Sequence, residues 1–237
     1  MLPAQIDDPR ILAGMRKQMT ARQSRLAAGD RRLGWKAGFG APPALAKFGL
    51  DGPLVGYLLQ SGRLESGATV SLAGWAQPIA EPEIAVHMGA ALGADADEAT
   101  ARAAIAGIGP AFELVDVTFP PEDVEAVLAG NIFQRHVVLG PVDHTRAGAN
   151  IEGLAGRVLR DGAEIAATTT LEANTGRIVD TVRRVAVMAA QLADGLQAGD
   201  VIITGSVVRP IPIGANDREL AFQLGSAGHV SVRFTHC

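Results

Sequence analysis

The stretch QPIAEPEIAVHMG, residues 77–89, has the pattern of a strand that carries two glutamates among mostly apolar residues. Side chains alternate between the two faces of a strand, so Glu81 and Glu83 are expected on the same face. Two neighbouring carboxylates in apolar surroundings repel each other and resist burial unless a cation or protons neutralise them. Pro82 cannot donate a ladder hydrogen bond, which predicts an edge strand or a bulge. This stretch therefore predicts a cation site beside a strand irregularity.

A third carboxylate lies in a second apolar run, AFELVDV, residues 111–117. Alternation places Glu113 on one face of this run and Asp116 on the other. Three carboxylates that converge from two strands suit a hard divalent cation such as Mg²⁺ or Mn²⁺. The alternative is that the glutamates are solvated charges on edge strands, where they block aggregation. His87 continues the Glu81 face, and we expect a structural histidine there rather than a fourth ligand.

Composition excludes several classes of protein. Hydrophobic residues make up 48% of the 237-residue chain and charged residues 19%, which excludes a disordered chain and predicts a sizeable core. The net charge of −4 gives no general attraction to nucleic acid or to an anionic membrane. We expect no secretory signal, and no apolar run approaches the roughly 20 residues of a membrane span. Cys237 is the only cysteine, so no disulfide framework is expected, and the predicted compartment is the cytoplasm.

The pattern of elements predicts an α+β fold with a large, curved, mostly β core, because strand patterns outnumber helical ones without alternating regularly with them. Asp8-Pro9 and Gly29 bound a predicted N-terminal helix. Helical spacing of apolar residues recurs over residues 176–192, and Asp161-Gly162 predicts a tight two-residue hairpin. The sequence contains no phosphate-binding or dinucleotide-binding glycine fingerprint and no nucleophile elbow.

Two further segments carry groups that can bind an anion. Lys36 lies in GWKAGFG, residues 34–40, where glycines let the backbone approach a ligand closely. A lysine there can neutralise an anion or transfer a proton, and a surface lysine in a loop is an equally good interpretation. A strand that ends in Thr204-Gly205-Ser206 presents hydroxyls and free backbone N–H groups, which can cradle a carboxylate or phosphate.

The order of these motifs resembles the 2-keto-4-pentenoate hydratase and 4-oxalocrotonate decarboxylase family, within the fumarylacetoacetate hydrolase superfamily. The motifs that carry the resemblance are Gly-x-Lys-x-Gly from Gly34, Gly-x-x-x-Pro from Gly49, Glu-x-Glu-Ile-Ala from Glu81, Glu-Leu-Val-Asp from Glu113, and Ala-Gly-Asp-Val-Ile-Ile-Thr-Gly-Ser from Ala198. The resemblance implies a β-rich fold of the fumarylacetoacetate hydrolase C-terminal-domain type, with curved mixed sheets. It also implies an N-terminal helical segment, residues 1–33, and a catalytic domain, residues 34–237, within a single compact unit.

The resemblance implies roles for seven residues. They are Glu81, Glu83 and Glu113 as metal ligands, Lys36 as the catalytic lysine, and Thr204, Gly205 and Asn131 as substrate-binding residues. The implied cofactor is Mg²⁺ or Mn²⁺, the implied substrate is a small 2-oxo acid, and the implied assembly is a homo-oligomer. We expect no nucleic-acid or membrane partner.

Two positions depart from the family's pattern. Leu54 follows Pro53 where the hydratases tend to carry an aspartate, and Phe133 stands two residues after Asn131 where the family commonly has a serine. The predicted function is a metal-dependent lyase of the hydratase type, acting on a 2-hydroxydienoic acid in the catabolism of aromatic compounds. The alternatives are a 4-oxalocrotonate-type decarboxylase and an acylpyruvate hydrolase that cleaves a carbon–carbon bond. Leu54 and Phe133 motivate a non-enzyme alternative, a metal-bound but non-catalytic partner subunit.

Overall fold

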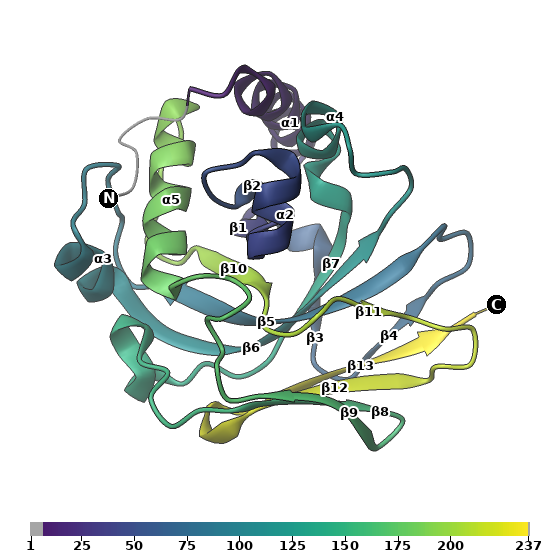
Figure 1. Ribbon diagram of the computed structural model, residues 1–237. Coiled ribbons are helices and arrows are strands. Elements are labelled where there is room, and N and C mark those ends of the chain that lie inside the picture. The colour runs from purple at the N-terminus through teal and green to yellow at the C-terminus, as the bar shows by residue number, and fades with distance from the viewer. Residues whose placement is uncertain (1–6, 237) are drawn as a thin grey trace.

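The strands form two sheets, and the helices gather on the side of the larger sheet that faces away from the smaller one (Figure 1). The computed structural model describes residues 7–236, so Cys237 lies outside the described part. The predicted α+β fold with a curved, mostly β core is confirmed. The proposed division after residue 33 stays a prediction, since the N-terminal helix packs directly on α4 and β2.

The element bounds fix where the functional residues lie. The helices are α1 (Pro9–Ala27), α2 (Pro42–Phe48), α3 (Glu98–Ala104), α4 (Val124–Ala129) and α5 (Ile178–Gln191), with short turns η1 (Gln60–Gly62), η2 (Asn131–Phe133), η3 (His144–Ala149) and η4 (Gly225–Ala227). The strands are β1 (Arg32–Gly38), β2 (Leu54–Leu59), β3 (Arg63–Glu65), β4 (Ala68–Ser71), β5 (Pro78–Met88), β6 (Ile105–Asp116), β7 (Gln134–Leu139), β8 (Gly156–Arg160), β9 (Ala163–Thr168), β10 (Val201–Ser206), β11 (Ile211–Pro212), β12 (Glu219–Leu224) and β13 (His229–Thr235).

The larger sheet has the order β2-β1-β10-β5-β6-β7-β3, and β11 pairs with β5 beyond the end of β10. The smaller sheet has the order β4-β13-β12-β8-β9. Most neighbours are antiparallel, and the parallel pairs are β1 with β10, β3 with β7 and β4 with β13. Both sheets are therefore built from segments that are distant in the sequence.

The larger sheet curls so far that side chains from β2, at one end, and from β7, next to the other end, belong to one cluster on its inner face. These inward residues form a cluster of their own: Leu33, Leu58, Ala85, Ala111, Val137, Leu139, Val201 and Ile203. The outer face belongs to the main core, which the helices cover at β1 and β2 and the smaller sheet covers at β6. Phe112 of β6 meets Phe222 of β12 there, with ring centroids 6.2 Å apart. Alternation along β6 thus sends Phe112 to the main core and Glu113 to the inner face.

Pro82 lies in a central strand beside a bulge, so of the two alternatives that the sequence left open, an edge strand or a bulge, the structure has the bulge. Strand β5 is flanked by β6 on one side and by β10 and β11 on the other. The register with β10 shifts between Ile203 and Ser206, opposite Ile84. The Pro82 carbonyl accepts from Val207 N at 2.9 Å, so its missing N–H would face the gap between β10 and β11. A central position is tolerated because the ladder is interrupted there in any case.

The N-terminal helix and the hairpin form as the sequence predicted. The Asp8 side chain accepts from Arg10 N at 2.9 Å, and Pro9 occupies the first turn of α1. Asp161 and Gly162 both have positive φ, 50° and 84°, as a type I′ turn between β8 and β9 requires.

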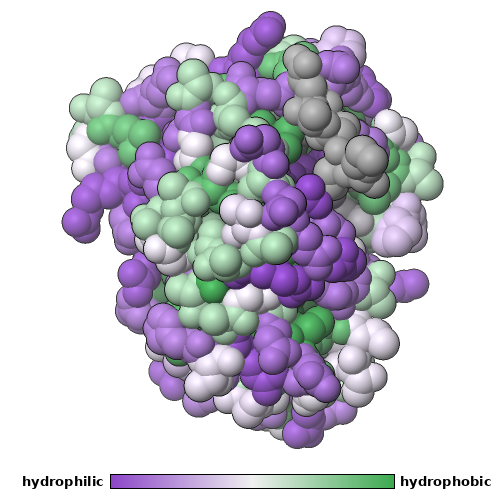
Figure 2. All heavy atoms as spheres, turned by 90° about the vertical axis from the view of Figure 1, so that its left-hand side faces the viewer, coloured by the Kyte–Doolittle hydropathy of each residue, from purple (hydrophilic) through white to green (hydrophobic). Residues whose placement is uncertain are grey.

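The outer surface over α3 and α5 mixes polar and apolar residues, as Figure 2 shows. An ion pair links the two helices there, between Arg177, which caps α5, and Glu98 of α3, at 2.5 Å. Over the whole described chain, Ile165 on β9 is the large hydrophobic residue that stays exposed, at 43%. No helix within residues 7–236 is both long enough and apolar enough to cross a bilayer.

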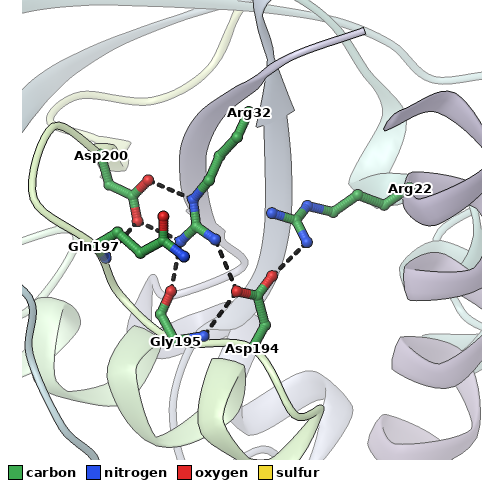
Figure 3. Close-up of polar contacts among 6 residues, drawn as sticks. All are labelled: Arg22, Arg32, Asp194, Gly195, Gln197 and Asp200. Carbon is green, nitrogen blue, oxygen red and sulfur yellow. Dashed lines mark hydrogen bonds and ion pairs between the residues drawn. The ribbon is translucent and has the colours of Figure 1, made fainter. Parts of the chain in front are cut away.

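An ion network ties the start of β1 to the start of β10 (Figure 3). Arg32 donates to Asp200 and, at 2.7 Å, to Asp194, which also pairs with Arg22 of α1. The backbone N–H of Gln197 donates to the Asp200 carboxylate at 2.9 Å. Burial would raise the pKa of Asp194, but hydrogen bonds from the Gly195 amide and from Arg32 outweigh it and lower the pKa. The network thus holds charged groups in their ionised forms.

This network sits at one end of the parallel β1–β10 pair, whose other end carries groups expected in the site. The register pairs Gly34 with Val201 and Lys36 with Ile203. Arg22 and Arg32 also lie over the buried Trp35 ring, at 5.0 Å and 5.3 Å from its centroid. Holding the strand starts together therefore fixes how Lys36 is placed relative to Gly205.

We predict that Asp200→Asn lowers the free energy of unfolding by about 2 kcal/mol, because it removes one of the two carboxylates that pair with the largely buried Arg32 and leaves Asp194 as the other. Chemical denaturation followed by circular dichroism measures the change. Glu164→Gln is the matched control, since Glu164 pairs with Arg157 at the surface and should contribute less than about 1 kcal/mol. Equal effects of the two substitutions would contradict a structural role for the network.

Candidate metal centre and active site

The three predicted metal ligands come together on the inner face of the larger sheet. Strands β5 and β6 are antiparallel neighbours, and their register places Glu81 directly opposite Glu113. Glu83 follows two residues later on the same face of β5. One oxygen from each of the three carboxylates lies within 4.8 Å of the others. The alternation of β5 and the pairing with β6 are sufficient to build this cluster.

Burial decides between the two interpretations of the cluster. Glu83 and Glu113 are fully buried, and Glu81 retains some exposure where it meets a cavity. Glu83 Oε1 and Glu113 Oε2 have no hydrogen-bond partner. Buried carboxylate oxygens without partners are costly unless a cation binds them. The arrangement excludes solvated edge-strand charges and fits a divalent cation that prefers oxygen ligands.

The pKa values of the three carboxylates also show that their charged forms are unfavourable in this buried position. Burial raises the pKa of Glu83 well above its usual value, and repulsion from Glu113 and Glu81 raises it further. Burial also raises the pKa of Glu113 to about 7, against the opposing effect of the Lys36 ammonium. The pKa of Glu81 is raised by burial as well. Without a cation, this cluster therefore holds protons that exposed glutamates would release.

Lys36 is a buried site residue rather than a surface lysine in a loop. It lies on β1 with 1% of its surface exposed, and its Nζ donates to Glu113 Oε1 and to the Ile132 carbonyl at 3.1 Å. A Cβ on Gly56 of the adjacent β2 would lie 2.9 Å from the Lys36 Cγ. Glycine at position 56 therefore gives the lysine side chain its path to the carboxylates.

The carbonyl that Lys36 contacts belongs to a left-handed turn. Asn131, Ile132 and Phe133 have φ values of 53°, 53° and 60°, a conformation that is unfavourable for a β-branched residue such as Ile132. Such strain persists only where surrounding contacts impose it. The Asn131 amide supplies two of them, accepting from Tyr57 N at 2.9 Å and donating to Tyr57 O at 3.0 Å.

Asn131 directs its side-chain hydrogen bonds to the backbone of β2, and its contact with a substrate stays a prediction. Both ends of its amide bind the Tyr57 backbone, and the residue borders a separate cavity of about 530 Å³ on the other side of the turn, near Trp75 and Arg135. Its neighbours Ile132 and Phe133 line the side that contains Lys36. In this structure Asn131 holds the turn in place.

The Thr204-Gly205 segment forms the bulge opposite β5, and its polar groups serve the site indirectly. The Thr204 hydroxyl donates to the Ile84 carbonyl at 3.1 Å. The Gly205 backbone amide donates to Glu83 Oε2 at 2.6 Å, so it orients a predicted metal ligand rather than remaining free for a substrate. Gly205 has φ of 98°, which a residue with a Cβ rarely adopts. Both residues nevertheless line a cavity beside the carboxylates.

Two cavities meet at Glu81, at the end of the curled sheet where β1, β6 and β10 finish. The lysine cavity, about 270 Å³, is lined by Lys36, Gly38, Phe39, Gln77, Ile79, Glu81, Val115, Val117, Pro121, Ile132, Phe133 and Pro210. The serine cavity, about 320 Å³, is lined by Ala37, Gly38, Phe39, Gly40, Ala41, Pro43, Ala44, Pro53, Glu81, Asn174, Thr175, Thr204, Gly205, Ser206 and Pro210. The two share Gly38, Phe39, Glu81 and Pro210, so a ligand at Glu81 has access to both.

Ser206, the last residue of the Thr-Gly-Ser segment that the sequence singled out, lines the serine cavity with a buried hydroxyl that has no partner. Other lining residues were not predicted. Phe39 has φ of 58° and borders both cavities, within the glycine-rich segment that also contains Lys36. Asn174 and Thr175 come from the loop before α5, and nothing in their local sequence marks them. Leu54 packs in the main core.

We predict that the metal-free protein becomes less stable as the pH rises from about 4.5 to about 7. The folded state holds protons on Glu113 and Glu83 that the unfolded chain has released, so raising the pH removes stability. Mg²⁺ should therefore raise the melting temperature more at about pH 8 than at about pH 5. Thermal unfolding with EDTA or Mg²⁺ measures both effects.

Glu83→Gln provides the comparison for this prediction. It removes one buried charge, so the metal-free variant should lose less stability on raising the pH, and it should show little stabilisation by Mg²⁺. An Mg²⁺ effect of the same size in the variant and the natural chain would exclude Glu83 as a ligand.

Comparison with known proteins places this geometry in a family. The fumarylacetoacetate (FAA) hydrolase C-terminal profile matches residues 45–235. A 2-hydroxyhexa-2,4-dienoate hydratase from Comamonas testosteroni is 29% identical over 216 residues, which cover 89% of this chain and 81% of that protein. A 4-oxalocrotonate decarboxylase from a Pseudomonas species is 26% identical over 191 residues, covering 80% of this chain and 73% of that protein.

The fold agrees with that of a solved structure. The 4-oxalocrotonate decarboxylase from Pseudomonas putida G7, complexed with magnesium and adipate, superposes with a TM-score of 0.85 at 22% identity. The superposition covers 95% of this chain and 86% of that one. Since the family profile matches most of the residues and the fold agrees, the chain belongs to the fumarylacetoacetate hydrolase C-terminal family.

Proposed function

We propose that this protein is a divalent-metal-dependent lyase that acts on a small 2-oxo acid or its 2-hydroxydienoic tautomer, with hydration as its reaction. The observation that carries the proposal is the buried cluster of Glu81, Glu83 and Glu113, in which two oxygens lack partners beside Lys36. The relatives named as a hydratase and a decarboxylase support the same class of substrate.

Glu81, Glu83 and Glu113 would hold Mg²⁺ or Mn²⁺, both of which prefer oxygen ligands. A cation bound there supplies Lewis-acid stabilisation of the negative charge that develops on the 2-oxygen of the substrate. Gly205 keeps Glu83 oriented through its amide, and Lys36 keeps Glu113 oriented through its ammonium. The chain thus fixes two of the three ligands from outside the β5–β6 pair.

Lys36 is the proposed catalytic residue because it lines the lysine cavity and its Nζ contacts Glu113. From there it can stabilise charge on the substrate or transfer a proton to or from carbon as the dienol and keto forms interconvert. The Ile132 carbonyl and Glu113 restrict its orientation. Thr204 and Gly205 border the serine cavity, where their backbone would lie against the substrate.

Asn131 has a positioning role in this proposal, and the direct substrate contact that we expected from the sequence stays a prediction. Its amide holds the turn whose Ile132 carbonyl contacts Lys36. Phe133 belongs to the same turn and lines the lysine cavity, so the replacement of a serine there alters the cavity wall and leaves the carboxylates in place.

Decarboxylation of a 4-oxalocrotonate-type substrate is the second candidate, since it passes through the same stabilised enolate. Carbon–carbon hydrolysis of an acylpyruvate needs a base that activates water, and in the described chain neither cavity is lined by a histidine or by an acid other than Glu81. The intact cluster and Lys36 argue against a non-catalytic partner subunit.

Three finer features complete the proposal and rest on the family resemblance. They are a preference for Mg²⁺, assembly as a homo-oligomer, and a place in the cytoplasmic catabolism of aromatic compounds. Light scattering after size exclusion tests the assembly, and activity with each metal in turn tests the preference.

We predict that the purified protein with Mg²⁺ or Mn²⁺ converts 2-hydroxypenta-2,4-dienoate to 4-hydroxy-2-oxopentanoate, and that EDTA abolishes the reaction. Loss of dienol absorbance gives the rate, and NMR identifies the product. Lys36→Met should lower kcat/KM by about 10²–10⁴ because it removes the proton-transferring group.

Lys47→Met is the control for Lys36→Met, since Lys47 is exposed and pairs with Glu122 at the surface. It should retain full activity. If the metal-loaded protein leaves both 2-hydroxypenta-2,4-dienoate and 4-oxalocrotonate unchanged, the lyase proposal is wrong.

A further inference from the structure

We infer that the site selects substrates whose tail, the part beyond the 2-oxo acid head, is uncharged and apolar. The expected class is a monocarboxylic 2-hydroxydienoate with a hydrogen or a short alkyl group at its far end, rather than a dicarboxylate. This inference rests on the proposed function, because it assumes that the head binds at the carboxylate cluster. It separates hydration from loss of a distal carboxylate, which the metal cluster alone does not.

The wall of the lysine cavity carries the inference. Beyond Lys36, Gln77 and Glu81, it consists of Gly38 and hydrophobic side chains, namely Phe39, Ile79, Val115, Val117, Pro121, Ile132, Phe133 and Pro210. These residues come from five separate segments of the chain, so the apolar character belongs to the cavity as a whole. A hydrocarbon tail gains from contact with such a wall.

The cations near the site are already committed elsewhere. Within residues 7–236, no arginine lines either cavity, and Lys36 is the lysine that does. Its ammonium donates to Glu113 and Ile132. Arg135 pairs with Asp116 and lines the separate cavity behind the left-handed turn. Arg184 binds Asp51 and the Pro53 carbonyl through Nη2 and Nε, and its Nη1 has no partner, but the residue lines neither cavity.

A second carboxylate would therefore meet an unfavourable environment in either direction. In the lysine cavity it would lose water against hydrophobic side chains without gaining a cationic partner. In the serine cavity the polar groups are Ser206, Thr204, Thr175 and the Asn174 amide, all neutral. Glu81 borders both cavities and repels a second negative charge in each.

Phe133 is the residue to which we assign most of this selection. It lies 8% exposed on the wall of the lysine cavity, and its ring centroid is 4.8 Å from that of Phe119. The left-handed turn fixes its backbone, and the aromatic neighbour fixes its ring. A cation in its place would add a positive charge to the wall of the lysine cavity.

The test compares two ligands of equal length, 2-oxohexanoate and 2-oxoadipate, with pyruvate as the head alone. Isothermal titration calorimetry on the Mg²⁺-loaded protein should show 2-oxohexanoate binding at least about tenfold more tightly than 2-oxoadipate. It should also bind more tightly than pyruvate, because its tail contacts the apolar wall. Equal or tighter binding of 2-oxoadipate would overturn the inference while leaving the metal site and the lyase proposal standing.

Failure of all three ligands to bind would instead overturn the proposed function, and the inference with it. Phe133→Arg should shift the affinity ratio toward 2-oxoadipate by about tenfold or more. Val117→Lys places a cation on the same wall from another segment and serves if Phe133→Arg does not fold. Ile165→Arg adds the same charge at a distant exposed position and should leave the ratio unchanged. A ratio unaffected by both wall variants would exclude the wall as the source of selectivity.

Discussion

The burial of three mutually repelling carboxylates is the constraint on which the rest of the structure depends. Adjacent strands place Glu81 opposite Glu113, and alternation adds Glu83, so the sheet cannot bury one without the others. One lysine and one backbone amide offset part of the repulsion. The repulsion that is not offset raises the pKa values of Glu83 and Glu113, and two carboxylate oxygens are left without partners. A site in this state is poised for a cation at the cost of stability without one.

The strands around the cluster place two groups that offset the repulsion between the carboxylates, the Lys36 ammonium and the Gly205 backbone amide. Lys36 and Gly205 lie at corresponding ends of parallel strands whose other ends are joined by the network of Arg32, Asp194 and Asp200. Parallel neighbours from distant parts of the sequence have no hairpin to set their register. The charged side chains at the strand starts, together with the strained turn at Ile132, therefore set how these two strands are aligned. The ion network at the strand starts thus contributes both to the stability of the fold and to the placement of Lys36 and Gly205 in the site.

The sequence revealed the parts of the site that follow from local periodicity. Alternation predicted that Glu81 and Glu83 share a face and that Asp116 does not join Glu113, and both are observed. Pairing partners are not a local property, so the sequence left open whether Pro82 lies on an edge strand or beside a bulge, and the structure has the bulge. Nor does periodicity show which donors are already occupied, and the Gly205 amide and the Asn131 side chain proved to be committed to Glu83 and Tyr57. The residues that line the two cavities could not be predicted from local periodicity, because loops from several segments of the chain contribute them.

Charge balance links the metal site to the kind of molecule it can accept. When all three glutamates are ionised, Lys36 cancels one negative charge, and a divalent cation cancels the other two. The buried site is then neutral before any substrate binds. A monocarboxylate adds one negative charge, which the cation can share directly, whereas a dicarboxylate adds a second that must lie against hydrophobic walls. Since buried charge is tolerated only when paired, the apolar lining of the lysine cavity and the neutrality of the loaded cluster favour the same substrate.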